Sequence, residues 1–428
     1  MKHQFIAIAL FALVVVSLVA CGGAPPATVA PGSGAAAPSG ATISIGALYD
    51  LTGATSDVGK DYSLGIQEAI ACFNDDGGIN GKKIKLSQSD YGYRVPEAVT
   101  IYKRYRDFDK VIALLGWGTG DTSALAPTVN KDQIPDISAS YSGELSDASK
   151  TPYNFFAGTD YSTSARAAMQ VWYDEVWKKD AKYASEQNRK PRVVMFYQAS
   201  SPYSSAPIKA LKDQAALLGF DVGPDQDVSL TALDTKSQVL AAKEFKADLI
   251  WHGNTTMSVS TALKDEKALG LNADNIVNVW GFDENLPRLA GDAAEGVIGI
   301  GVAAFYGEAV PGMDKVLACG AKYNPGVPKE QRLNRTLQGW ANATLLKKAL
   351  ERADKAGQLT GAGVKAALET LQNEDIGMGV TPLTFTATDH RPGSTVRIYT
   401  FKGGKPQLVK AIDMKAKWPD KYASWLGY

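Results

Sequence analysis

The stretch Leu114–Pro127, LLGWGTGDTSALAP, decides the fold. It completes an apolar run, VIALL at 111–115, that is typical of a buried strand. The chain then passes through three glycines (Gly116, Gly118 and Gly120). Asp121 to Ser123 offer N-cap chemistry for a helix that is expected to begin near Ala124. A strand that leads through glycines into a helix presents unpaired N–H groups at the positive end of a helix dipole. The stretch is therefore predicted to bind a carboxylate or another strongly polar group, with an ordinary strand-to-helix turn as the alternative.

The segments around this stretch alternate between strand and helix patterns. Strands are expected at 42–49, 82–87, 111–115 and 134–138, with helices at 60–74 and 97–107. This β-α-β-α-β order argues for a parallel, doubly wound sheet, in which ligands bind beyond the carboxyl ends of the strands. The loops at those ends are 50–59, 116–122 and 139–143.

The same style of pattern restarts after residue 160. Helices are expected at 161–177, 206–219, 237–245 and 257–270, and strands at 192–197, 248–251 and 276–280. The last third adds strands at 296–305 and 395–401, helices at 335–354 and 363–372, and a tight turn at 402–405. We therefore expect two α/β halves without sequence repetition. Aromatic residues gather at the expected strand ends and favour an apolar-walled cleft: Trp117, Tyr141, Tyr203, Trp280 and Phe282.

The N-terminus has the features of an export signal. Lys2 precedes an apolar run at 5–18 that is too short to span a bilayer, which is typical of a signal peptide covering 1–20. The run ends in LVAC at 18–21, which resembles a bacterial lipobox and implies cleavage before Cys21 and lipidation of its sulfur. A secreted protein with a chance cysteine there is the alternative. Residues 22–41, rich in Ala, Pro, Gly and Ser, predict a flexible linker behind the lipidated Cys21.

Composition narrows the function. The 428 residues are 45% hydrophobic and 21% charged, and 45 basic residues balance 45 acidic ones, so no nucleic-acid partner is expected. No HExxH, GxSxG, Walker or CxxC pattern occurs, so we expect no enzymatic activity, no cofactor and no metal site. His252 is interpreted as a structural histidine. Cys72 and Cys319 could pair in an oxidising compartment, but the sequence leaves their disulfide open.

Several short motifs recur in an order that resembles a known family. They are GA at 46–47, DLTG at 50–53, GGINGKK at 77–83, GWGTGDTSALAP at 116–127, IPDISAS at 134–140 and GDAAEGV at 291–297. Together with the lipobox, they resemble the solute-binding proteins of branched-chain amino-acid-type ABC transporters, which have the periplasmic binding protein type I fold. The resemblance implies two doubly wound α/β lobes joined by three crossovers, near 160, 300 and 391. Lobe one would be 42–160 plus 302–390, and lobe two 161–301 plus 391–428.

The resemblance also implies a set of ligand-binding residues in the cleft. They are Trp117, Thr119, Gly120 and Asp121 in one loop, Ser140, Tyr141 and Ser142 in the next, and Tyr203, Asn254 and Asp283 in lobe two. The first loop would hold a ligand carboxylate, while Asp283 or Glu284 would pair with a ligand ammonium. Two departures leave the ligand open: Asp121 would repel a carboxylate unless it caps the helix, and Tyr141 replaces a small residue. Relatives bind short amides, urea and aromatic acids as well as amino acids.

The expected function is the extracytoplasmic solute-binding component of an ABC importer. The protein would be a monomer that binds a small amino acid, carboxylate, amide or aromatic acid between its lobes and delivers it to permease subunits. It would be lipid-anchored to the outer face of the bacterial cytoplasmic membrane, or periplasmic. A ligand-sensing ectodomain for a regulatory system is the alternative, and an extracytoplasmic hydrolase is disfavoured because no nucleophile–base pair is visible.

Overall fold

The computed structural model describes residue 40 and residues 42–428. The predicted signal peptide, the lipidated Cys21 and all of the predicted linker except Gly40 lie outside the described residues. Among the residues that are described, no helix combines the length and the apolar character needed to cross a bilayer.

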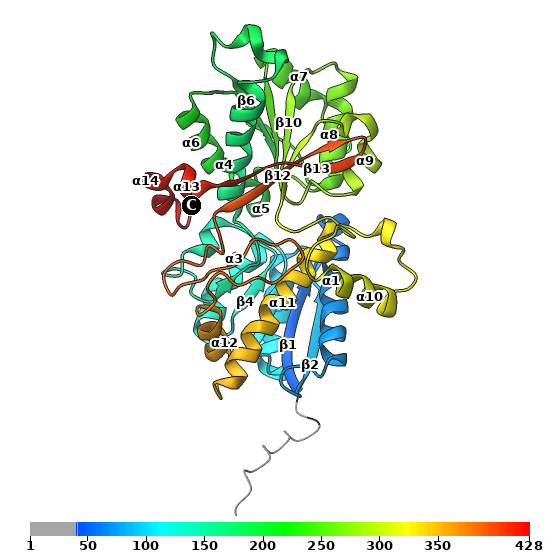
Figure 1. The fold of residues 1–428 in the computed structure, drawn as a ribbon, viewed down its shortest axis with the longest axis vertical. Coiled ribbons are helices and arrows are strands. Elements are labelled where there is room, and N and C mark those ends of the chain that lie inside the picture. The colour runs from blue at the N-terminus through cyan, green and yellow to red at the C-terminus, as the bar shows by residue number, and fades with distance from the viewer. Residues whose placement is uncertain (1–39, 41) are drawn as a thin grey trace, which may run out of the picture. The chain divides into compact units, whose positions relative to one another are not determined.

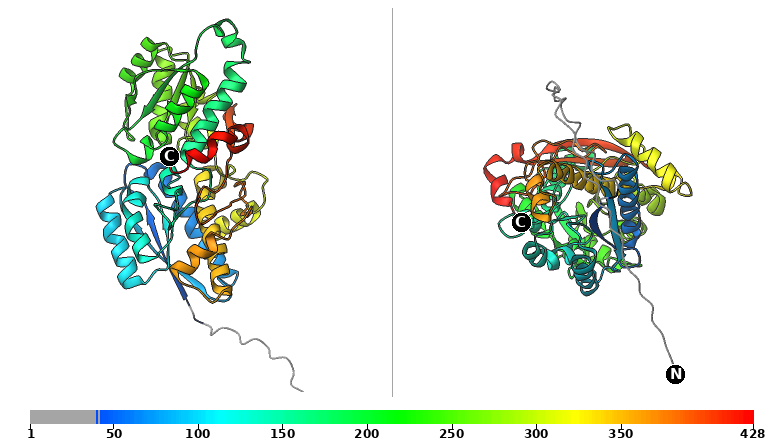
Figure 2. Two further views of the ribbon diagram at one scale, coloured as in Figure 1. Left: turned by 90° about the vertical axis from the view of Figure 1, so that its left-hand side faces the viewer. Right: turned by 90° about the horizontal axis from the view of Figure 1, so that it is seen from below.

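The first half of the described chain builds a five-stranded parallel sheet with the strand order β2-β1-β3-β4-β5. Its strands are β1 (Thr42–Tyr49), β2 (Lys83–Asp90), β3 (Ala113–Gly116), β4 (Asp136–Ser138) and β5 (Asn154–Phe155). Every residue of β3 is buried, as a parallel strand covered by helices on both faces requires. The side view of Figure 2 shows α2 (Val95–Arg104) and α3 (Thr119–Asp132) on one face, and α11 (Asn334–Lys355) and α12 (Gly361–Leu368) on the other. The expected β-α-β-α-β unit is confirmed.

Two helices of this sheet approach so closely that only glycine fits between them. A Cβ on Gly65 of α1 (Ser56–Asp75) would lie 2.0 Å from the Thr336 carbonyl oxygen of α11. A Cβ on Gly339 of α11 would lie 2.2 Å from the Tyr62 carbonyl oxygen. Figure 1 shows the two helices side by side. Their backbone contact fixes the position of α1. The first turn of this helix carries Val58, which lines the candidate site.

The start of α3 differs from the sequence prediction. The helix begins at Thr119 rather than near Ala124, and Gly118 occupies the N-cap position without a side-chain cap. Asp121 does not cap the helix, because its Oδ1 accepts a hydrogen bond from the Tyr91 hydroxyl at 2.7 Å. The prediction that Asp121 to Ser123 cap this helix is therefore wrong. The helix starts earlier, and its first free amides lie directly behind the end of β3.

The second sheet has eight strands in the order β13-β12-β11-β10-β9-β6-β7, with β8 paired to β6. The strands that were expected are β6 (Arg192–Tyr197), β9 (Leu249–His252), β10 (Asp274–Val277), β11 (Ile298–Gly301) and β12 (Thr395–Lys402). Three more extend the sheet: β7 (Asp221–Val222), β8 (Gln226–Asp227) and β13 (Lys405–Asp413). The pairs between β6 and β11 are parallel, whereas β12 and β13 are antiparallel. Gly403 and Gly404, both with positive φ, form the tight turn between them, as expected.

Helices surround this second sheet, as Figure 1 shows. They are α4 (Tyr161–Val171), α5 (Pro202–Ser205), α6 (Ile208–Leu218), α7 (Lys236–Phe245), α8 (Thr256–Ala268) and α9 (Asn285–Ala290). The chain ends in two short helices, α13 (Met414–Lys417) and α14 (Pro419–Tyr422). We call the five-stranded sheet with its helices lobe one, and the eight-stranded sheet with its helices lobe two.

The chain passes between the lobes three times, which confirms the expected architecture. The passages run from β5 to α4, from β11 to α10 (Met313–Tyr323), and from α12 to β12. Helix α10 returns to lobe one, where a disulfide joins its Cys319 to Cys72 of α1 across 247 residues of sequence. The bond that the sequence left open is thus present, and it ties the second passage of the chain to the first helix of lobe one.

Candidate ligand-binding site

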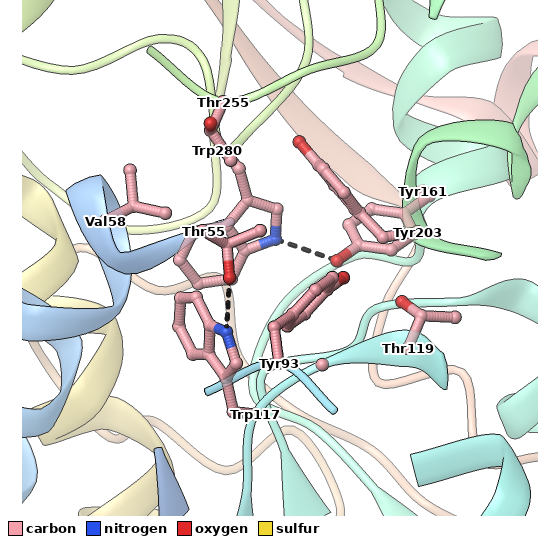
Figure 3. Close-up of a pocket in the computed structure, with 10 residues that line it drawn as sticks. Thr55, Val58, Tyr93, Trp117, Thr119, Tyr161, Tyr203, Thr255 and Trp280 are labelled. Atoms are coloured by element: carbon pink, nitrogen blue, oxygen red, sulfur yellow. Dashed lines mark hydrogen bonds between the residues drawn. The ribbon is translucent and has the colours of Figure 1, made fainter. Parts of the chain in front are cut away.

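A small pocket lies where the two lobes meet, with a cavity volume of about 20 Å³. Lobe one contributes Thr55, Val58, Tyr93, Trp117, Gly118 and Thr119 to its lining, and lobe two contributes Tyr161, Tyr203, Thr255 and Trp280. Most of these residues follow the carboxyl ends of parallel strands, because Thr55 follows β1, Trp117 follows β3 and Trp280 follows β10. This is the edge at which α/β sheets of this kind bind ligands. Figure 3 shows the lining residues around one common space.

Five of the lining side chains are aromatic, and the polar atoms of four of them are already engaged. The Trp117 Nε1 donates to Thr55 Oγ1 at 2.9 Å, and the Trp280 Nε1 donates to the Tyr161 hydroxyl at 2.8 Å (Figure 3). The Tyr203 hydroxyl donates to Asn278 Oδ1 at 2.8 Å. The Trp117 and Trp280 rings meet across the lobes with centroids 4.9 Å apart. What these residues offer a ligand is therefore mainly the surface of their rings.

The remaining polar groups of the lining are few. Thr119 Oγ1 shares a hydrogen bond of 2.8 Å with Ser140 Oγ. Thr255 Oγ1 is shielded from solvent and has no hydrogen-bond partner among the described residues. The backbone at Gly118 and Thr119 opens α3, so its amides are available at the positive end of the helix dipole. The lining contains no charged side chain.

The structure brings three of the ten ligand-binding residues predicted from the sequence into this lining: Trp117, Thr119 and Tyr203. Gly120 and Asp121 line a neighbouring groove of about 240 Å³, which shares Tyr93 with the pocket. Gly120 and Asp121 therefore lie beside the pocket without lining it.

The second predicted loop lies behind the lining rather than in it. Ser140 holds Thr119 through the hydrogen bond described above, and Tyr141 stacks on Trp280 with centroids 5.7 Å apart and planes 7° apart. Ser142 is buried beside them and does not line the pocket. These residues can act on a ligand only by positioning Thr119 and Trp280.

Asn254 and Asp283 do not line the pocket either, because other groups occupy their side chains. Asn254 contacts Ser204 Oγ at 2.6 Å and donates to the Val228 carbonyl oxygen at 2.9 Å. Asp283 accepts from Thr256 Oγ1 at 2.6 Å and lies 3.4 Å from the Arg335 Nε. The structure therefore pairs Asp283 with an arginine of the protein, not with a ligand ammonium.

Glu284, the other acid considered for that role, is engaged in the same way. Its two carboxylate oxygens accept the Tyr306 and Asn334 backbone amides, each at 2.9 Å. Burial raises the pKa of Glu284 to about 7. Phe282, which the sequence placed in the cleft wall, stacks on Phe401 in the core of lobe two, with centroids 4.3 Å apart.

Two carboxylates of lobe one flank the pocket. Asp57, in the first turn of α1, accepts the Met257 amide of α8 at 3.1 Å, which is a direct hydrogen bond between the lobes. Burial raises the pKa of Asp57 to about 6. Asp121 lies behind Gly118, where a Cβ would come within 2.4 Å of its Oδ1. Burial raises the pKa of Asp121 to about 7, against the lowering effect of the Tyr91 hydroxyl.

Sequence reasoning missed several lining residues. Thr55 and Val58 fall in the loop 50–59 that was expected at the site, but no motif singled them out. Tyr93 follows β2 with a φ of 57°, which is rare for a residue other than glycine and gave no sequence signal. Tyr161 begins α4 at the first passage between the lobes, so only the fold reveals its position.

Neither a cluster of metal ligands nor an unengaged His252 is found among the described residues. Residues 42–428 contain no group of three or more His, Cys, Asp or Glu side chains placed to hold a metal. His252 is 2% exposed and lies 2.9 Å from Asn275 Oδ1 and 3.3 Å from Glu266. Its interpretation as a structural histidine is confirmed.

The chain belongs to the periplasmic binding protein family, whose model matches residues 42–405. It is 34% identical to a structure of an ABC transporter substrate-binding protein from Aeropyrum pernix, covering 87% of this chain and 96% of that one, with a TM-score of 0.76. A branched-chain amino acid ABC transporter structure from Thermus thermophilus with bound valine is 23% identical, covering 89% and 99%, with a TM-score of 0.80.

An amino acid binding protein from Pseudomonas aeruginosa is 40% identical over 76 residues, which are 18% of this chain and 20% of that protein. The family and the type I fold expected from the sequence are thus confirmed, and the chain is a solute-binding protein.

Proposed function

We propose that the protein captures a small nitrogen-bearing solute of the amino-acid and amide kind in the pocket and delivers it to an ABC permease. The observation that carries this proposal is the lining, which draws six residues from lobe one and four from lobe two. A ligand can be enclosed by such a pocket only when the lobes come together around it. Closure of this kind is how hinged binding proteins commit to a ligand.

The volume of the pocket limits the size of the solute. Ligand pockets for drug-sized molecules measure ~300–1,000 Å³. The pocket, with a cavity of about 20 Å³, lies far below that range, so the lobes must part to admit a solute. The names of the relatives, which include a structure with bound valine and an amino acid binding protein, support a small solute.

We assign distinct roles to the residues predicted for the site. Trp117, Thr119 and Tyr203 would contact the solute, because they line the pocket. The other seven would act indirectly, by shaping the lining or its electric field: Gly120, Asp121, Ser140, Tyr141, Ser142, Asn254 and Asp283. The lobe bounds of 42–160 with 302–390, and 161–301 with 391–428, belong to the same proposal.

The proposal includes the way in which the protein is held and assembled. It acts as a monomer without enzymatic activity, exported and anchored through lipid on Cys21, so that the residues behind it tether the lobes near a permease. Mass spectrometry of the N-terminal peptide tests the anchor. A peptide that begins at Cys21 and carries acyl chains is expected, and an unmodified peptide would contradict lipidation.

Thermal melting and calorimetric titration with valine, glycine, acetamide, urea and benzoate test the solute class. A ligand present at about 100 times its Kd should stabilise the protein by about 2.7 kcal/mol. Trp117→Ala should abolish the stabilisation, whereas Trp177→Phe, a buried substitution in lobe two outside the lining, should retain it. If no nitrogen-bearing solute raises the melting temperature, the solute class is wrong.

A further inference from the structure

We infer that the pocket selects a small cation whose charge lies on a methylated nitrogen, that is, a quaternary ammonium compound without a carboxylate, of which choline is the simplest probe. The inference rests on the proposed function for the pocket and for delivery to a permease, but it moves the nitrogen-bearing solute outside the amino acids and amides. Three features of the structure lead to it: the rings of the lining, the shortage of hydrogen-bond acceptors, and the charges around the pocket.

The rings form a box around the cavity. Tyr93, Trp117, Tyr161, Tyr203 and Trp280 contribute five rings to a lining of ten residues, and they come from both lobes (Figure 3). A cation within about 6 Å of an aromatic face is attracted by the quadrupole of the ring, and several rings together recognise quaternary ammonium groups. Closure of the lobes completes such a box, because neither lobe carries all five rings.

The lining is poorly equipped for a primary ammonium group. An –NH₃⁺ group has three hydrogen-bond donors that need acceptors when they leave water. In the described structure, Thr55 Oγ1 already accepts from Trp117, and the Tyr161 hydroxyl already accepts from Trp280. Of the lining side chains, Thr255 alone has a buried oxygen without a partner among the described residues. A methylated nitrogen has no N–H donors and therefore avoids this deficit.

The charges around the pocket favour a cation. Asp57 and Asp121 flank it, and neither forms an ion pair with any residue that the structure describes. Each has one carboxylate oxygen that is shielded from solvent and makes no hydrogen bond within residues 42–428. Burial raises the pKa of both side chains, and for Asp57 it outweighs the lowering effect of Arg335. A cation in the pocket would supply the missing opposite charge, whereas a ligand carboxylate would be repelled.

The nearby arginine does not reverse this field. Arg335 lies over the Trp280 ring, with its guanidinium carbon 5.1 Å from the centroid. It is fully buried, and Asp283 lies 3.4 Å away, so that the two charges balance. The pair therefore adds no net charge, and the field in the pocket is the balance between the unpaired acids of lobe one and the amides that open α3.

Calorimetric titration of the mature chain tests the inference with three probes: choline, the neutral compound in which carbon replaces the choline nitrogen, and valine. Choline and its carbon analogue have the same shape, so the difference between their affinities isolates the charge. Choline should bind at least about tenfold more tightly than the analogue, because the box acts on the cation through its rings. Valine should bind more weakly than choline.

Substitutions of Trp280 test the role of the rings. Trp280→Leu should abolish choline binding, and Trp280→Phe should retain part of it. The matched control Trp177→Phe should bind choline as the unsubstituted protein does, because Trp177 is equally buried but does not line the pocket. If Trp280→Leu fails to fold, the comparison of choline with its carbon analogue on the unsubstituted protein decides the matter alone.

The outcomes separate this inference from the proposed function. Equal affinity for choline and its carbon analogue would overturn the inference, because the pocket would then recognise shape alone. Binding of valine or an amide without binding of choline would overturn it as well, while the proposed function would stand. If none of the three probes binds, the inference fails, and the wider set of nitrogen-bearing solutes decides the proposed function separately.

Discussion

The two lobes place acids beside the pocket in different states, and we call these two sides its walls. On the wall of lobe one, Asp57 and Asp121 have no cationic partner among the described residues. On the wall of lobe two, Asp283 is matched with Arg335 at 3.4 Å, and both side chains are fully buried. Asp121 and Asp283 looked alike in the sequence, since each follows a strand and a glycine. The difference teaches that a buried acid at a strand end can serve a ligand only if the rest of the fold leaves its charge unpaired.

Removing the partner on the lobe-two wall should have the largest effect. Arg335→Met leaves Asp283 as an uncompensated buried charge, which costs about 3–5 kcal/mol of unfolding free energy. Chemical denaturation measures this loss. The double variant with Asp283→Asn should recover much of it, because the two residues then no longer hold an unpaired charge. A loss below about 1 kcal/mol for Arg335→Met would show that the pair is not what neutralises this wall.

Breaking the covalent link in lobe one should come next. Replacing both Cys72 and Cys319 with serine removes a bond that joins α1, which carries Asp57, to α10. The expected loss is about 2–4 kcal/mol, typical of disulfides that close long loops. Thermal melting with and without reductant checks it: reductant should lower the melting temperature of the native protein and leave the double variant unchanged. If the double variant melts like the oxidised native protein, the bond contributes nothing to lobe one.

The unpaired Asp121 of lobe one should make the stability of the protein depend on pH. Burial raises the pKa of Asp121 from 3.8 to about 7 in the folded protein, so the folded state holds this proton more tightly than the unfolded chain does. Stability from this group is therefore complete below about pH 4 and is lost as the pH rises towards about 7. Asp121→Asn should make the urea midpoint less sensitive to pH over this window.

The groups that face Asp121 define the control for this measurement. The Tyr91 hydroxyl donates to its Oδ1, and Asp136 is a second buried acid close enough to raise its pKa further. Burial also raises the pKa of Asp136 to about 7. Asp136→Asn should therefore flatten the same part of the pH profile. If the pH dependence of the urea midpoint is unchanged in both variants, these acids are not uncompensated in the folded protein.

The hydrogen bond between the two walls should give the smallest effect. Asp57→Ala removes the acceptor of the Met257 amide, a bond that forms only when the lobes meet. Asp57 is half-buried, so we expect a loss of about 1 kcal/mol, or roughly fivefold in ligand affinity, without a change in unfolding free energy. Calorimetric titration measures the affinity, and the exposed substitution Glu97→Ala on α2 serves as a control. A drop in stability without a drop in affinity would show that Asp57 supports lobe one alone.

The sequence was sufficient for the architecture and for part of the site. Strand and helix periods placed the parallel sheets, and the rule that ligands bind at strand ends led to Trp117 and Thr119. It could not show that Arg335, on a helix far along the chain, would occupy Asp283. It could not foresee Tyr93 either, whose place depends on an unusual backbone conformation. Such contacts depend on how distant segments pack, which the local pattern of a sequence does not encode.

The contact between Trp117 and Trp280 provides an intrinsic fluorescence probe of lobe opening. One indole comes from each lobe, and their centroids are 4.9 Å apart. Any opening that separates the lobes must part these two chromophores and let water reach them. The tryptophan emission maximum and the near-ultraviolet circular dichroism of the unlabelled protein should therefore report the opening and closing of the lobes in real time, with no attached dye.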